Sequence, residues 1–187
     1  NKKDIDEFEE ELKKIQAAGS LDAKAEAGLK KILENSGIPV TAENISKIVS
    51  ALQMSSSALN MSDDTKAYIV GNSLTPTIEN IYHGQYSGSD AFDGEVYDAE
   101  IWKQIKPQVE RLIDATGFDK ESAVADAKWL FANDLPVTAD ALKTMSVLND
   151  ISSDMSAKTA FEQILQSVAA GAEPEQASLD TSEFVIA

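Results

Sequence analysis

The sequence predicts an all-α fold, arranged as an irregular array of repeated helix–turn–helix hairpins with about eight to ten helices. Apolar residues recur at helical spacing along nearly the whole chain. Glycines and capping Ser, Thr or Asp residues separate these stretches. A hairpin motif also recurs along the chain, and recurrence of this kind indicates repeated helical units.

The N-terminal part, 1–18, is expected to form one highly charged helix that ends at Gly19-Ser20. A narrow apolar seam runs along it at spacings of three, four and three residues: Ile5, Phe8, Leu12 and Ile15. Such a seam packs either on its own domain or on another chain. A helix this polar must dock its seam to persist, and we expect it to dock within the same chain.

Later helices are marked by caps, stops and apolar stripes. Two helices are expected to start near Ser62 and near Asp98. The last clear helix carries the apolar residues Phe161, Ile164, Leu165 and Val168. The residues expected to cap other helices are Ser20 or Asp22, Thr41, Thr77, Asp119 and Thr138. The expected stops are Gly37, Gly117 and Gly171.

The longest helix is predicted from about Asp98 to Thr116, with Pro107 kinking it because proline removes a backbone hydrogen bond. Its inward residues are expected to be Ile101, Trp102, Ile105, Val109, Leu112 and Ile113. A strand is predicted only in the tail, at Phe184-Val185-Ile186.

The hairpin motif is the most informative feature. The segments 33–43 and 130–140 align without a gap at an offset of 97 and share Pro-Val-Thr-Ala. A third, weaker copy covers 69–81. In each unit a helix ends in polar residues, and a threonine then caps the next helix, with an acid in its first turn favoured by the helix dipole. We predict that Thr41 and Thr138 are equivalent caps of two similar hairpins.

These hairpins carry a family resemblance. The segments that carry the resemblance are the Ile/Leu-Pro-Val-Thr turns, Thr75 to Tyr82, Gln85 to Gly88, Ile101 to Val109 and Gly171 to Pro174. Over about Ile32 to Leu179, the chain resembles an uncharacterised helical domain family of Gram-positive anaerobes. Similar Leu-Pro-x-Thr hairpins occur in proteins resembling flagellar hook-length control proteins. The resemblance implies an assembly or export role and carries over no catalytic residues.

Charge limits the expected partners. The chain of 187 residues has 32 acidic and 16 basic residues, a formal net charge of −16. Nucleic acids and anionic membrane surfaces are therefore repelled, and no apolar run is long enough to cross a bilayer. We expect another protein as the partner. The absence of Cys excludes disulfides, thiolate chemistry and cysteine-ligated zinc, and a single histidine cannot make a two-His metal site. Neither a cofactor nor a metal is expected.

The chain is expected to have three parts: the charged helix 1–18, a helical-hairpin domain 20–171 and an acidic tail 172–187. An acidic loop, 84–98, divides the hairpin domain into sub-units 20–84 and 98–171. Because the chain lacks both an initial Met and a signal-peptide core, we expect a trimmed or mature fragment of a soluble protein, cytoplasmic or exported.

The acidic loop partly resembles a calcium-binding EF-hand loop. Aligning Gly94 with the turn glycine puts Asp93, Val96 and Glu100 at suitable positions. The first and third ligand positions then fall on Ser89 and Ala91, and an alanine cannot coordinate calcium. We therefore favour a plain solvated loop.

Catalytic motifs are equally weak. His83 is the only histidine, and no nucleophile elbow accompanies it. Gly71-Asn72-Ser73-Leu74 resembles a lipase segment but belongs to a repeat turn. Leu135 to Ala139 resembles a sortase signal without the span and basic tail that such signals need. Trp102 and Trp129 are interpreted as core residues.

We therefore predict no catalytic, cofactor or metal residues, and a non-catalytic protein-interaction or assembly module linked to flagellar or secretion machinery. The alternative is a secreted or surface domain that binds a carbohydrate or a metal ion through loop 87–100. An enzyme of another type ranks third.

Overall fold

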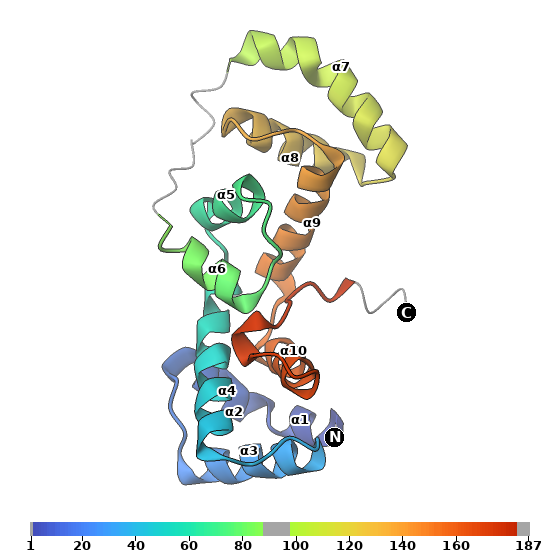
Figure 1. Cartoon of the computed structure of the whole chain (residues 1–187). Helices are drawn as coiled ribbons and strands as arrows, with labels where there is room; N and C mark the ends of the chain where they lie inside the picture. The colour runs from blue at the N-terminus through green and yellow to red at the C-terminus, as the bar shows by residue number, and fades with distance from the viewer. Residues whose placement is uncertain (1, 88–97, 183–187) are drawn as a thin grey trace. The chain divides into compact units, whose positions relative to one another are not determined.

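The computed structural model describes residues 2–87 and 98–182, and these residues form helices and connecting turns. The prediction of an all-α fold with eight to ten helices is confirmed (Figure 1). Within the described residues the α-helices are α1 (Lys2–Glu7), α2 (Glu9–Ala18), α3 (Ala23–Asn35), α4 (Ala42–Met54), α5 (Asp63–Gly71), α6 (Ile78–Gly84), α7 (Ala99–Thr116), α8 (Lys120–Ala132), α9 (Ala139–Asp154) and α10 (Ala157–Ala169). Two 3-10 helices, η1 (Ser55–Ala58) and η2 (Pro174–Gln176), complete the set.

The chain divides into two compact units, each discontinuous in sequence. Unit 1 comprises 1–60, 76–82 and 151–187, and unit 2 comprises 61–75 and 83–150. The sequence predicts a helical-hairpin domain, 20–171, with sub-units 20–84 and 98–171. That division stays a prediction. Within unit 1, residues of the acidic tail are part of the packed structure, because Ala177 and Leu179 are buried.

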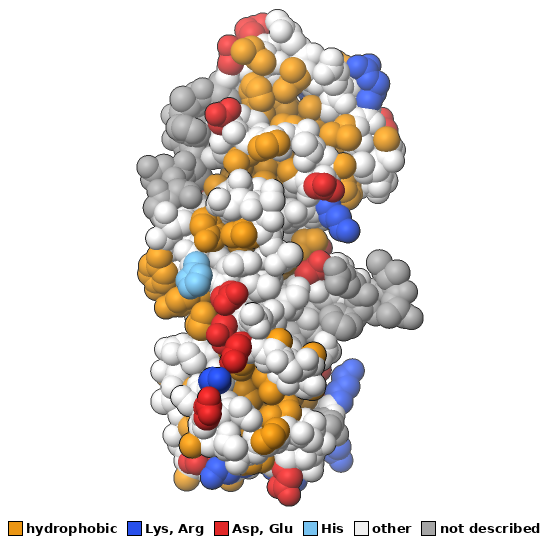
Figure 2. All heavy atoms as spheres, viewed as in Figure 1, with side chains coloured by type: hydrophobic (Ala, Val, Ile, Leu, Met, Phe, Trp, Pro, Cys, Tyr) orange, Lys and Arg blue, Asp and Glu red, His pale blue; other side chains and the backbone are white. Residues whose placement is uncertain are grey.

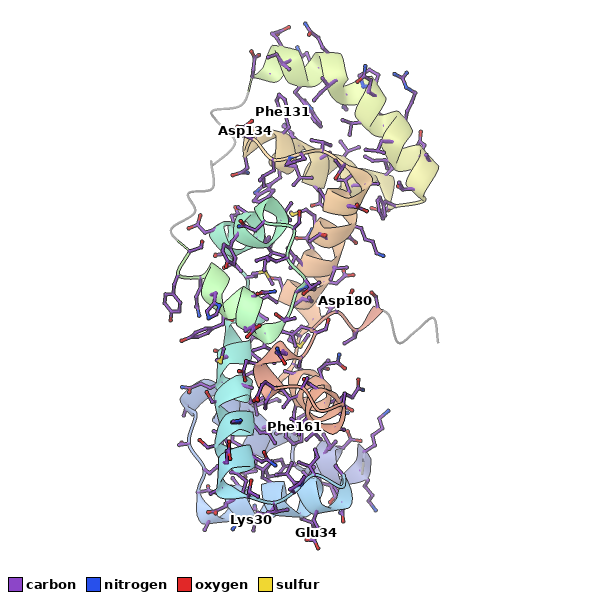
Figure 3. The ribbon with its side chains drawn as sticks, viewed as in Figure 1. Lys30, Glu34, Phe131, Asp134, Phe161 and Asp180 are labelled. Carbon is purple, nitrogen blue, oxygen red and sulfur yellow. The ribbon has the colours of Figure 1, made fainter. Side chains whose placement is uncertain are left out.

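Unit 1 is built around α2, α4 and α10, which pack against one another. Ile48 and Leu52 of α4 and Phe161 and Ile164 of α10 are buried, and Phe161 is labelled in Figure 3. The segment before α6 is tied to the tail by backbone hydrogen bonds, from Leu179 to Pro76 and from Ile78 to Ala177, both 3.0 Å long.

Unit 2 is organised by the packing of α7 on α8. The ring of Trp102 lies 5.8 Å from that of Phe131, and the Phe131 side chain lies on the side of α8 that faces α7 (Figure 3). Trp102 is buried, which confirms its assignment to the core, whereas Trp129 is only half-buried. The apolar core of α8 and α9 includes Ala127, Leu130, Leu142, Met145 and Leu148.

The N-terminal segment docks within its own chain, as expected, because the whole seam of Ile5, Phe8, Leu12 and Ile15 is buried. It is not one continuous helix. At Phe8 the backbone has φ −94° and ψ 2°, and its N–H is shared between the carbonyls of Asp4 and Ile5, each 3.1 Å away. The break separates α1 from α2 and accompanies the packing of the Phe8 ring against Gly28 of α3.

The repeated turns have the same backbone geometry. The N–H of Ile38 donates to the carbonyl of Leu33 at 3.0 Å, and the N–H of Leu135 donates to that of Leu130 at 2.9 Å. In the third copy Leu74 donates to Ile69, also at 2.9 Å. A hydrogen bond from an N–H to the carbonyl five residues earlier, closed around a residue in the left-handed conformation, is the Schellman motif of helix C-termini. The residues in the left-handed position are Gly37, Asp134 and Ser73, with φ of 72°, 57° and 52°.

The prediction that two threonines cap equivalent hairpins is also confirmed. The hydroxyl oxygens of Thr41 and Thr138 each accept a hydrogen bond from a backbone N–H three residues later, and both distances are 3.0 Å. Thr77 accepts the corresponding bond from Asn80 at 3.2 Å. The turn recurs once more than the sequence predicted, after α10, where Ala172 donates to Ser167 at 2.9 Å and Gly171 has φ 86°.

The structure corrects the expected orientation of α7. Ile101 was expected inward, but its side chain is 45% exposed, while Trp102, Val109 and Ile113 are buried. Pro107 lies inside the helix on its exposed face, and the ribbon of α7 changes direction along its length (Figure 1). A proline on the solvent side bends a helix while leaving its packed face intact.

Candidate interaction site

The sequence-derived motifs with a chemical interpretation lie at helix ends. His83 is exposed in the last turn of α6. Ser73 lies in the turn after α5 and Thr138 caps α9, so the lipase-like and sortase-like segments are both turns. The calcium-loop candidates Ser89, Ala91, Asp93, Gly94 and Val96, and the predicted strand at 184–186, lie outside the described residues. Glu100 is described and lies in the first turn of α7.

Among the described residues, charged side chains form ion pairs and small groups of one lysine with two acids. In the parts of the chain that the structure describes, no group of three or more His, Cys, Asp or Glu residues could hold a metal ion. Lys47 of α4 contacts Glu43 and Glu173, each at 3.2 Å. The hydrogen bond to Glu173, followed by that to Glu43, raises the pKa of the Lys47 ammonium. All three groups are solvent-accessible, and this arrangement ties α4 to the residue before η2.

Among the described residues of unit 2, the carboxyl group of Asp126 is half-buried. Burial raises the pKa of Asp126 on α8, although a hydrogen bond from Asn149 and the charge of Lys66 oppose the change. The Asn149 amide donates to Asp126 Oδ1 at 3.0 Å. The hydrogen bond between Asn149 and Asp126 is therefore a polar contact that joins α9 to α8.

The candidate interaction site is a surface groove in unit 1, which we call the α4 groove. Its volume is about 420 Å³. Its lining residues are Gly19, Leu21, Glu26, Ala42, Ile45, Ser46, Val49, Ser50 and Gln53. The spacing of the α4 members follows one face of a helix, so α4 forms one wall. The turn between α2 and α3 and the first part of α3 form the other.

The α4 groove exists because α4 is apolar beyond the stripe that enters the core. Ile48, Ala51 and Leu52 are buried, whereas Ile45 and Val49, which lie beside this stripe on the helix surface, are half-buried. Leu21, across the groove, is also half-buried. Hydrophobic side chains reach the surface of the molecule in places on the face shown in Figure 2. The groove therefore combines accessible apolar side chains with the hydroxyl and amide groups of α4.

Electrostatics around the groove are acidic. Glu26 is the charged member of its lining, and it contacts Lys30 at 3.1 Å across one turn of α3. Unit 1 has nine basic and 17 acidic residues and unit 2 has seven and 15, so each carries a formal charge of −8. Such a surface attracts basic partners at long range.

A smaller hollow of about 170 Å³ lies where α1 meets α3. It is lined by Asp4, Glu7, Phe8, Gly28, Lys31 and Ile32. A Cβ atom at residue 28 would lie only 2.6 Å from Phe8 Cε1, so Gly28 is required for the close approach of the ring. Lys30 and Glu34, labelled in Figure 3, are exposed residues of the same helix.

The groove itself does not follow from the sequence. The helical period predicts one apolar stripe of Ile45, Ile48, Val49 and Leu52 on the helix after Thr41, and it gives no role to Leu21. A helical period identifies an apolar face, yet it does not tell how much of that face a neighbouring helix covers. The one available signal was the width of the stripe, which spans more of α4 than a single packed neighbour needs.

Comparison with known proteins identifies a family. No helix among the described residues is long and apolar enough to span a bilayer. No curated protein and no solved structure matches the chain significantly. Residues 18–183, by contrast, match a family described as a family of unknown function, DUF6240. Since this match covers most of its length, the chain belongs to the DUF6240 family.

Proposed function

We propose that this chain is a non-catalytic protein-interaction or assembly module, and that the α4 groove binds an amphipathic, basic helix of another protein. The groove supports the proposal through the half-buried apolar side chains of Ile45 and Val49, opposite Leu21. Apolar side chains in a groove between helices are the usual receptor for the apolar face of a partner helix.

Charge selects the type of helix. Glu26 lies in the groove and the unit around it carries −8, so basic residues flanking the apolar face of a partner favour association. An acidic helix with the same apolar face is repelled. The small groove predicts a weak, transient complex at the low end of the range of interface sizes.

We further propose that this assembly role is linked to flagellar or secretion machinery, because the sequences of the Leu-Pro-x-Thr hairpins resemble those of hook-length control proteins. In such a role, the hairpin that joins α3 to α4 within unit 1 holds the two helices whose residues line the groove. The alternative, binding of a carbohydrate or a metal ion through loop 87–100, stays a prediction. Of that loop the structure describes Ser87, Asp98, Ala99 and Glu100.

The test uses two fluorescent peptides that form helices with the same apolar face, one flanked by Lys and the other by Glu. Fluorescence anisotropy is expected to show binding of the basic peptide to the intact chain, weakening as salt is added. Val49→Lys, which puts a charge in the groove, is expected to weaken this binding by about tenfold or more.

The matched control is Val40→Lys. Val40 is 42% exposed, precedes α4 and does not line the groove, so the same substitution there should leave peptide binding unchanged. Equal affinity for the basic and acidic peptides would contradict the charge selection. An unchanged affinity in Val49→Lys would remove the α4 groove as the binding site.

A further inference from the structure

The N-terminal segment 2–18 has an unusual relation to the rest of unit 1. The family match begins at residue 18, the last residue of α2, so α1 and almost all of α2 precede it. Nevertheless α2 packs against α4, α10 and η1. Leu12 and Ile15 of α2 are fully buried there. The family-defined part of the chain therefore presents a surface that receives a helix from outside it.

This helix-receiving surface is formed by α4, α10 and η1, and it holds the segment by polar contacts as well as apolar ones. Gln16 Nε2 donates to Ser55 Oγ at 3.0 Å, and both side chains are buried. Ser55 Oγ in turn donates to the carbonyl of Leu52 at 2.5 Å, which fixes its orientation. At the other end of the segment, Asp6 forms an ion pair with Lys158 of α10.

The neighbouring helix α3 contacts both α1 and Phe8. Asn35 Nδ2 donates to Asp4 Oδ2 at 3.1 Å. Gly28 allows the Phe8 ring to approach the backbone of α3, because any side chain there would collide with the ring. The surface that holds the segment therefore makes apolar contacts, amide hydrogen bonds and an ion pair, and these require particular side chains at particular positions of the docked helix.

The docked segment has little helical stability of its own. It contains six acidic and four basic side chains, and Phe8 interrupts it without a side-chain cap on α2. Each piece is shorter than the roughly 12–15 residues that an isolated helix needs to be even marginally stable in water. A short connection through Gly19, with φ 67°, joins it to the cap of α3 at Asp22.

We propose that the helix-receiving surface is a second binding site, which the chain's own segment 2–18 occupies and blocks. The external ligand it fits is an amphipathic helix that repeats the chemistry of this segment. Such a helix has apolar residues at the spacing of Ile5, Phe8, Leu12 and Ile15, a glutamine after the last of them to bond Ser55, and an acid near its start for Lys158. Undocking of α1 and α2 opens the site.

Native-state hydrogen exchange on the intact chain tests the undocking. The backbone amides of α2 are expected to exchange through an opening at least about tenfold more frequent than the openings that expose α4 and α10. Equal protection of α2, α4 and α10 at every denaturant concentration would overturn the proposal, because the segment would then be an inseparable part of unit 1.

Peptide binding tests the site itself. A labelled peptide with the sequence of residues 2–18 is titrated into the intact chain and into its Leu12→Ala variant, whose own segment docks less well. Because less of the variant's surface is blocked, its apparent affinity for the peptide should be at least about tenfold higher. A peptide carrying Leu12→Asp is the matched control and should not bind.

The result remains separable from that for the α4 groove. Val49→Lys should leave binding of the 2–18 peptide unchanged, since Val49 is not among the buried residues of α4. Absence of binding to both chains would overturn the proposal. A stable dimer of intact chains in light scattering, exchanging their N-terminal segments, would also overturn the assignment of the segment to its own chain.

Discussion

Single residues in the left-handed conformation determine the shape of the repeated turns. Gly37 and Asp134 occupy equivalent positions, but glycine adopts a positive φ without the steric cost that a side chain incurs. A Cβ atom at residue 37 would meet nothing within 4 Å, so a substitution there changes backbone energy alone. The two turns therefore form a matched pair in which one is relaxed and the other strained.

This pair gives opposite expectations. Gly37→Ala should lower the free energy of unfolding by about 1 kcal/mol, and Asp134→Gly should raise it by a similar amount. Urea denaturation followed by circular dichroism measures both. Asp134→Ala is the control, since it removes the carboxylate but keeps the strained φ. If it stabilised the protein as much as Asp134→Gly, charge rather than backbone strain would be the cause.

Protonation of Asp126 should raise the free energy of unfolding, whereas protonation of a carboxylate that is stabilised in the folded state lowers it. Burial raises its pKa in the folded state above the unfolded value. The favourable contribution of its neutral form is therefore present at low pH and is lost as the pH rises through the folded-state pKa. At neutral pH the buried charge opposes folding.

We accordingly expect Asp126→Asn to raise the free energy of unfolding at pH 7, because its side-chain carbonyl can still accept the hydrogen bond from Asn149. The gain should shrink as the pH falls and Asp126 becomes protonated in the wild type. Denaturation curves across the acid range measure it. Asp140→Asn, which removes an exposed acid near the start of α9, is the charge control and should give no such gain.

At the scale of elements, the hairpins illustrate how caps and turns cooperate. A Schellman arrangement ends the first helix, and a threonine hydroxyl then begins the next. Both interactions satisfy backbone groups that a helix end would otherwise leave without a partner. Because the interactions are local, they form in the same way in unit 1 and in unit 2.

Loss of either threonine cap should therefore cost the same. Thr41→Ala and Thr138→Ala are each expected to lower the free energy of unfolding by about 1 kcal/mol, while Thr→Ser at the same positions should retain most of it. Chemical denaturation of the four variants checks this. A much larger cost at one site would show that the two hairpins are not energetically equivalent.

At the scale of the whole molecule, the N-terminal segment contributes to the apolar core of unit 1 and so to its thermal stability. It buries four apolar side chains, each contributing roughly 1.5–3 kcal/mol when fully buried. Deleting residues 1–18 should thus lower the melting temperature measured by calorimetry. The mass in light scattering should remain that of a monomer. A dimeric intact chain that becomes a stable monomer on truncation would instead show that the seam joins two chains.

The sequence by itself determined the helices, their caps and the repeated turns. These features depend on residues within about five positions of each other: Thr41 bonds a group three residues away, and the turn at Gly37 closes over five. Glycine, proline and capping side chains act at that range. The break at Phe8 and the exposure of Ile101 escaped prediction because both depend on what the neighbouring helix covers.

Only the tertiary structure decided the division into two discontinuous units and the candidate sites. The bond between Leu179 and Pro76, and that between Gln16 and Ser55, join residues far apart in sequence. Likewise, the α4 groove is open because no segment of unit 1 buries Ile45 and Val49 completely among the residues described. Periodicity measures how apolar a face is, whereas the packing of distant segments determines whether that face becomes core or surface.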